Sequence, residues 1–85
     1  MLYQIEVSGM ASRQLRKLSR AVQEIIGESI DALAIDPRPD GCVKLSGMKD
    51  TYRVREGDYR IIYQVRDQKL LVLVLEVANR REVYR

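Results

Sequence analysis

The feature that most constrains the fold is an alternating stretch at residues 51–64, TYRVREGDYRIIYQ. Apolar and basic side chains alternate on both sides of Glu56-Gly57-Asp58, with the period of two half-buried strands. Gly57 supplies the positive φ that a two-residue hairpin loop needs, so the stretch predicts a β-hairpin. Successive strand residues point to opposite faces, so one face collects aromatic and aliphatic side chains. The other face collects three arginines: Arg53, Arg55 and Arg60.

The pairing of these arginines depends on the loop. A Gly57-Asp58 loop places Arg55 opposite Arg60. A loop shifted by one residue places Arg53, instead of Arg55, opposite Arg60. Like charges that face each other across two strands destabilise a sheet. Guanidinium groups, however, match phosphate oxygens in pairs. The hairpin therefore predicts either a phosphate-binding face or the solvated outer face of a basic sheet.

The first half of the chain predicts one strand and two helices. Residues 2–7 alternate as a strand, Ser8-Gly9 interrupts the pattern, and residues 10–18 follow a helical one. Ser19 is suited to cap a second helix, which Pro37 is expected to end. The apolar stripe of that helix is expected to pack on the sheet, and it consists of Val22, Ile25, Ile26, Ile30 and Leu33.

The second half predicts strands. Residues 37–47 have turn signals and are expected to form a loop, and residues 70–77 are apolar at nearly every position. Such a run is typical of a central strand that is covered on both faces. The element order β-α-α-β-β-β predicts a single α+β domain over residues 1–85. In it an αα-hairpin covers one face of a mostly antiparallel sheet. The covered side chains are expected to be Tyr52, Val54, Tyr59, Ile61 and Tyr63.

Composition narrows the chemistry. The chain has no histidine and one cysteine, Cys42, which argues against zinc hydrolysis, imidazole-based triads and an internal disulfide. Neither a metal nor another cofactor is expected, and a reducing, cytoplasmic compartment fits. The longest apolar run is too short to cross a bilayer, so no membrane partner is expected. The whole net charge of +3 belongs to residues 49–85, which points weakly to nucleic acid.

Two further groups of basic residues are candidates for RNA contact. The first consists of side chains that are either solvated or bound to phosphate: Arg13, Arg16, Lys17, Arg20 and Lys44. The second is the tail, in which Arg80, Arg81 and Tyr84 directly follow the apolar strand. If the tail stays near the sheet, its arginine and phenol groups reach the arginine face. Guanidinium groups there suit metal-independent phosphodiester chemistry, because they stabilise the charge of a phosphorane.

These motifs resemble the RelE family of toxin–antitoxin systems over the whole chain. The similarity rests on residues 45–48 (LSGM), 52–55 (YRVR), 58–63 (DYRIIY) and 77–84 (VANRREVY). The resemblance implies a small α+β fold and a ribosome-dependent endoribonuclease that cuts messenger RNA in the ribosomal A site. It also implies a cognate antitoxin as a partner. The messenger's 2′-hydroxyl would attack the adjacent phosphate, leaving a cyclic phosphate and a free 5′-hydroxyl.

By this resemblance Arg60 would stabilise the scissile phosphate, Arg80 would stand near the leaving oxygen, and Tyr84 would stack on the nucleotide. Arg53 and Arg55 occupy positions where relatives have basic residues, often lysines. An arginine does not readily lose its proton, so electrostatic roles fit them better than that of a general base. Asn79 stands where many relatives carry histidine. Glu56 and Glu82 remain candidate bases by chemistry alone.

Two other functions stay open on this fold. One is a non-catalytic toxin like those of the ParE branch, which act on DNA gyrase. The other is a degenerate member that only binds RNA or a protein partner. The set of Arg53, Arg55, Arg60, Arg80 and Tyr84 favours the nuclease, because a gyrase poison does not need it.

Overall fold

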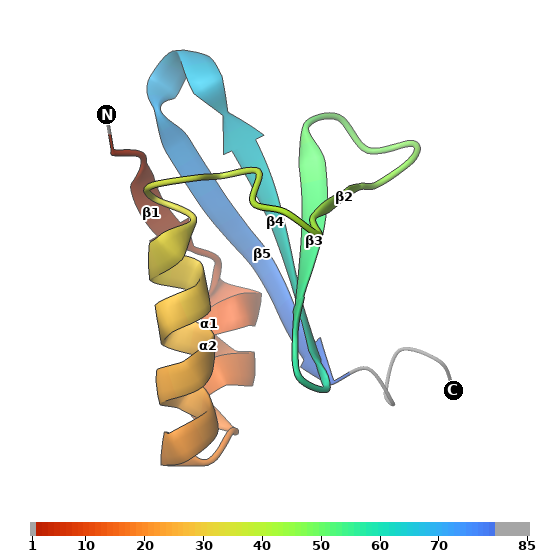
Figure 1. Cartoon of the computed structure of the whole chain (residues 1–85). Coiled ribbons are helices and arrows are strands. Elements are labelled where there is room, and N and C mark those ends of the chain that lie inside the picture. Colours follow the sequence, from red (N-terminus) through yellow and green to blue (C-terminus); the bar gives the residue numbers. More distant parts are fainter. Residues whose placement is uncertain (1, 80–85) are drawn as a thin grey trace.

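The computed structural model describes residues 2–79, which form two helices and one five-stranded sheet (Figure 1). The sheet has the strand order β1-β5-β4-β3-β2. The elements are β1 (Gln4–Val7), α1 (Gly9–Arg16), α2 (Arg20–Ala32), β2 (Val43–Lys44), β3 (Thr51–Glu56), β4 (Tyr59–Arg66), the 3-10 turn η1 (Asp67–Lys69) and β5 (Leu71–Asn79). The predicted α+β class is confirmed. The short strand β2 was not predicted, and it lies inside the segment expected to be a loop. None of the helices in residues 2–79 is both long and apolar enough to cross a membrane.

Serine side chains set the start of both helices. The hydroxyl of Ser8 accepts a hydrogen bond from the backbone N–H of Ala11, and that of Ser19 accepts one from Val22. Each bond satisfies one of the N–H groups that the first turn leaves without a partner. The predicted cap at Ser19 is therefore confirmed. The helix α1 ends at Arg16, two residues earlier than predicted.

The apolar stripe of α2 is narrower than predicted. Ile26, Ile30 and Leu33 are buried and Val22 packs against them, but 51% of Ile25 is exposed. At about 100° per residue, Ile25 lies roughly 95° from the centre of that buried stripe. The C-terminal end of α2 was also predicted too late in the sequence. The helix ends at Ala32, and its C-cap, Leu33, donates its N–H to Ile30, well before Pro37.

The hairpin of β3 and β4 has the Gly57-Asp58 loop, one of the two loops that the sequence left open. Glu56 pairs with Tyr59 and Arg55 pairs with Arg60, which decides between the two registers. Gly57 has a φ of 59°, and Asp58 is not in the positive-φ region. Positive φ at the first loop residue alone is the pattern of a type II′ turn, in which glycine avoids the clash of a side chain.

The strand β5 lies inside the sheet, between β1 and β4, as predicted for a central strand. It pairs parallel with β1 and antiparallel with β4, with a bulge between Ile62 and Tyr63. Its coverage was predicted wrongly. Val72, Val74 and Val77 are buried beneath the helices, whereas most side chains on the other face within residues 71–76 are only half-buried. These half-buried residues include Leu71, Leu73 and Glu76.

The core lies between the helices and one face of the sheet (Figure 1). Ile61 and Tyr63 are fully buried there, with Tyr52 beside them and Val54 and Tyr59 packed against the cluster, as predicted. The rings of Tyr52 and Tyr63 stack with centroids 5.9 Å apart. The hydroxyl of Tyr63 donates to the carbonyl of Pro37 at 2.7 Å, so the loop after α2 is fixed to the core.

A surface cluster holds three separate segments together at one end of the sheet. The guanidinium of Arg38 donates to both carboxylate oxygens of Asp67, at 3.1 and 2.7 Å, and its Nε donates to the hydroxyl of Tyr52. The hydroxyl of Tyr3 donates to Asp67 at 2.6 Å. The hydrogen bonds from Arg38 and then from Tyr3 lower the pKa of Asp67 to about 2. Asp67 therefore links the N-terminal segment, the loop after α2 and the β4–β5 turn.

This cluster predicts a loss of stability in acid. The folded pKa of Asp67 lies below its ordinary value of 3.8, so its contribution is present above about pH 4 and is lost as the pH falls through about 2. We expect the urea midpoint of the wild type to fall over this window. The Asp67→Asn variant should be less stable at pH 7 and should lose less on acidification. Urea titrations at pH 7 and pH 2.5 test this, and equal losses in the two proteins would contradict it.

Candidate active site

The predicted arginine face lies on the side of the sheet that the helices leave uncovered. Arg53 and Arg55 come from β3 and Arg60 comes from β4. They alternate with Tyr52, Val54 and Ile61, which face the core, so they point to the opposite side. Arg55 is exposed, whereas Arg53 and Arg60 are half-buried. Three guanidinium groups thus share one short segment of the open face.

The register creates a repulsion that the sheet has to offset. Arg55 lies directly opposite Arg60, and like charges in this position destabilise a sheet by up to about 1 kcal/mol. An anion bound between them would remove the repulsion, because each guanidinium donates two parallel hydrogen bonds to a phosphate or carboxylate. The arrangement is therefore suited to hold a phosphate group and to stabilise additional negative charge on it.

The strand β5 supplies the other wall of this face. Ala78 lies opposite Arg60 and is buried. Glu76 lies opposite Ile62 on the same face and is half-buried. Glu76 was not predicted as a site residue, because residues 70–77 were expected to form a strand covered on both faces. A charged residue within an apolar run was the signal that one face of this strand is open.

The predicted tail residues Arg80, Arg81 and Tyr84, together with Glu82, lie outside the described residues. The last described residue, Asn79, pairs with Tyr59, which precedes Arg60 in β4. The end of β5 and the hairpin loop lie together at one end of the sheet (Figure 1).

Glu56 does not belong to the arginine face. It pairs with Tyr59 on the side that faces the helices, and its carboxylate accepts a hydrogen bond from the hydroxyl of Ser29 in α2. This candidate base therefore lies in contact with a helix and away from the arginines. Its role here is to connect α2 to the tip of the hairpin.

The remaining RNA-binding candidates do not gather around these arginines. Four are exposed residues in or beside the helices, which cover the other side of the sheet: Arg13, Arg16, Lys17 and Arg20. Lys44 is exposed in β2 and lies opposite Tyr52, so it also points to the helix side. Within residues 2–79, no three His, Cys, Asp or Glu side chains lie together in a way that suits a metal ion.

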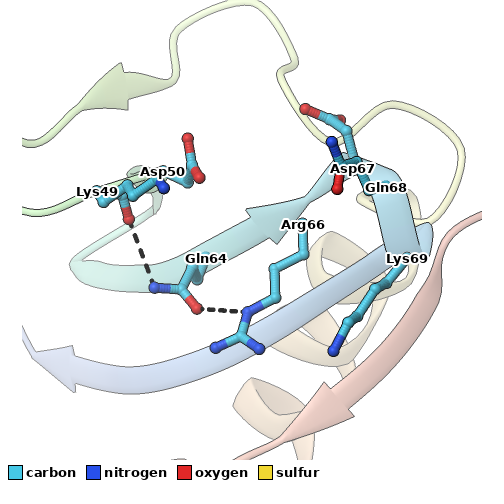
Figure 2. Close-up of a pocket in the computed structure, with 7 residues that line it drawn as sticks. All are labelled: Lys49, Asp50, Gln64, Arg66, Asp67, Gln68 and Lys69. Atoms are coloured by element: carbon cyan, nitrogen blue, oxygen red, sulfur yellow. Dashed lines mark hydrogen bonds between the residues drawn. The ribbon is translucent and has the colours of Figure 1, made fainter.

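A second basic group on the open face was missed. Lys49, Arg66 and Lys69 surround a hollow at the end of the sheet away from the hairpin loop (Figure 2). The signal was present in the alternation of β4, since Arg60, Gln64 and Arg66 all occupy positions of the same face.

Comparison with known proteins places the chain in a family. The family described as the ParE toxin of the type II toxin–antitoxin system parDE matches residues 5–84. The mRNA interferase toxin RelE of Escherichia coli K12 is 35% identical over 99% of this chain and 92% of its own length. The toxin RelG of Mycobacterium tuberculosis is 28% identical over 100% of this chain and 99% of its own.

Solved structures agree in fold. RelE in the archaeal RelE–RelB complex of Pyrococcus horikoshii superposes with a TM-score of 0.83 at 30% identity, covering 94% of this chain and 97% of that chain. The isolated RelE toxin of E. coli gives a TM-score of 0.80 at 34% identity, over 96% and 90% of the two chains. The fold and these full-length matches show that the chain belongs to the RelE/ParE superfamily of type II toxins and is RelE-like.

Proposed function

We propose that this protein is the toxin of a type II toxin–antitoxin system and a ribosome-dependent endoribonuclease that cuts messenger RNA in the A site. The observation that carries the proposal is the face on which Arg55 lies opposite Arg60 with Arg53 beside them. The relatives support it, because those of E. coli and Shigella flexneri, each 35% identical over 99% of this chain, are named mRNA interferases. The reaction is a phosphoryl transfer within the messenger itself.

In this reaction the messenger's 2′-hydroxyl oxygen bonds to the adjacent phosphorus while the bond to the 5′-oxygen breaks. The 2′-hydroxyl proton passes to a base, and the leaving 5′-oxygen takes up a proton. The products are a 2′,3′-cyclic phosphate and a 5′-hydroxyl, so no water is consumed and no cofactor is required. The phosphorane carries more negative charge than the starting diester. Fixed cations therefore accelerate the step by binding the transition state more tightly than the substrate.

The roles follow from position and chemistry. Arg60 is half-buried, with Arg55 opposite it on one side and Ala78 on the other, and we assign it to the charge that develops on the scissile phosphate. Arg53 and Arg55 bind and orient the phosphates electrostatically, since a guanidinium does not act as a base. Arg80 is assigned to the leaving oxygen and Tyr84 to stacking on the nucleotide or to proton transfer, roles that rest on the family resemblance. Arg81 is assigned to the RNA backbone.

The partners are a cognate antitoxin and the ribosome, which places the protein in the cytoplasm. Support for the antitoxin comes from relatives solved as RelE–RelB complexes from P. horikoshii and as the intact RelBE complex from E. coli. An inhibitory segment that covers the arginine face would need acidic groups for the guanidiniums and apolar groups for the half-buried leucines of β5.

A ParE-like action on DNA gyrase is the second candidate, because the matching family carries the ParE description. Gyrase inhibition needs no phosphodiester chemistry, so it does not explain why Arg55 and Arg60 lie opposite each other in spite of their repulsion. The two functions make opposite predictions for a purified translation system that contains no gyrase.

Ribosome toeprinting of a translated message provides the test. With the protein added, we expect a new stop within the A-site codon, absent when the ribosomes are omitted. Expression in cells should arrest growth, and co-expression of the adjacent gene product should relieve the arrest. Supercoiling by purified gyrase serves as the second arm. An unchanged toeprint together with inhibited supercoiling would favour the ParE-like function, and no effect in either assay would leave a partner-binding member.

A further inference from the structure

The hollow at the β4–β5 turn is a second basic site on the open face. It has a volume of about 630 Å³ and is lined by Lys49, Asp50, Gln64, Arg66 and the turn residues 67–69 (Figure 2). Gln64 lies opposite Thr51 and Arg66 lies opposite Leu71, so both side chains share the face of Arg60. Six residues of strand separate Arg66 from Arg60, or about 20 Å, too far for one phosphate to contact both.

The charge balance of the hollow favours an anion. The cations are Lys49, Arg66 and Lys69, and none of them forms an ion pair within the described residues. Of the two carboxylates, Asp67 is already paired with Arg38 and also accepts a hydrogen bond from the hydroxyl of Tyr3. In Figure 2 the carboxylates of Asp50 and Asp67 lie across the hollow from the charged ends of Arg66 and Lys69.

The guanidinium of Arg66 is held in place before any ligand arrives. Its Nε donates to Oε1 of Gln64 at 2.9 Å, and Nε2 of Gln64 donates to the carbonyl of Lys49 at 3.4 Å (Figure 2). Within residues 2–79, the terminal nitrogens of Arg66 form no hydrogen bond. They are available for a paired contact with a phosphate, and the relay through Gln64 reduces the rotamer freedom lost on binding.

We propose that this hollow binds a phosphate of an RNA backbone while the arginine face holds the scissile phosphate about 20 Å away along the same side of the sheet. This site rests on the proposed function for its biological ligand. Its role is to position the RNA, so it contributes to the affinity for RNA and not to the chemical step. The backbone belongs either to the messenger beyond the A-site codon or to ribosomal RNA.

Binding of a fluorescent single-stranded RNA at several salt concentrations tests the site directly. The slope of log K against log salt is negative, and each phosphate contact that is lost makes it shallower by about 0.7 for a single strand. We expect Arg66→Gln and Lys69→Gln each to show this loss. In the double variant, the fall in affinity between 50 and 200 mM salt should then be about 7-fold smaller than in the wild type.

The Ala32→Glu variant is the matched control, because it also lowers the net charge by one unit but lies at the end of α2 on the other side of the sheet. Its slope should equal that of the wild type. The proposal is overturned if both pocket variants keep the wild-type slope, or if Ala32→Glu loses as much as Arg66→Gln. Arg66→Lys keeps the charge and should retain most of the slope.

Cleavage on programmed ribosomes separates the two RNA sources. We expect the double variant to need more toxin for half-maximal cleavage while keeping the saturating rate. If this defect disappears on a message truncated directly after the A-site codon, the site binds the messenger. If it persists, the site binds ribosomal RNA. The positioning role is overturned if the double variant needs no more toxin than the wild type for half-maximal cleavage of either message. It is also overturned if the saturating rate of the double variant is reduced. If the wild type does not cleave at all, the proposed function fails, and the salt-slope experiment still decides whether the hollow binds RNA.

Discussion

Replacement of Arg60 by alanine should slow single-turnover cleavage of an A-site codon by roughly 10²–10³-fold, the usual effect of removing one preorganised electrostatic donor. Arg60 is half-buried in β4, and Arg55 and Ala78 flank it. Its place in the strand is thus fixed by the sheet before the substrate arrives. Binding to ribosomes should weaken much less, because many other basic residues contribute to it.

The Arg60→Lys variant is the informative control. It keeps the positive charge but loses the paired donors, so its rate should lie between those of the alanine variant and the wild type. Saturating toxin on programmed ribosomes isolates the chemical step from binding. If both Arg60→Ala and Arg80→Ala cut at the wild-type rate under these conditions, the arginine face is not the active site.

Local patterns in the sequence predicted most of the fold. The alternation around Gly57 and the cap at Ser19 each depend on neighbours within a few residues, and the structure confirms them. The stripe of α2 is confirmed except at Ile25. The short strand β2 has only two residues and therefore no period to detect. The parallel pairing of β1 with β5 brings together segments more than 60 residues apart, which local propensity does not specify.

The same distinction explains the site. Arg53, Arg55 and Arg60 lie within one hairpin, so a single turn determines their arrangement and the sequence predicted it. The hollow combines Lys49 from the loop before β3, Arg66 from β4 and Lys69 from η1. Only the register of β3 with β4 brings these residues together. The contact of Glu56 was not predicted for a similar reason, because its partner Ser29 belongs to a helix far away in the sequence.

Replacement of Ile26 by aspartate should unfold most of the protein. Ile26 has no exposed surface and packs in the core between α2 and the sheet. The variant loses about 2–5 kcal/mol of apolar packing, and a carboxylate without a partner in that place costs several kcal/mol more. A domain of this size is stable by only about 5–15 kcal/mol, so the combined loss takes most of that margin.

The neighbouring residue supplies a matched control for this prediction. Ile25 belongs to the same helix, but 51% of its surface is exposed, so Ile25→Asp adds the same charge without burying it. Its free energy of unfolding should stay within about 0.5 kcal/mol of the wild-type value, as is usual for surface substitutions. Urea titrations followed by circular dichroism at 222 nm distinguish the two variants. If Ile26→Asp unfolds at the wild-type midpoint, α2 does not pack on the sheet through this side chain. If both variants unfold alike, the two residues do not differ in burial, and the orientation of α2 described above is wrong.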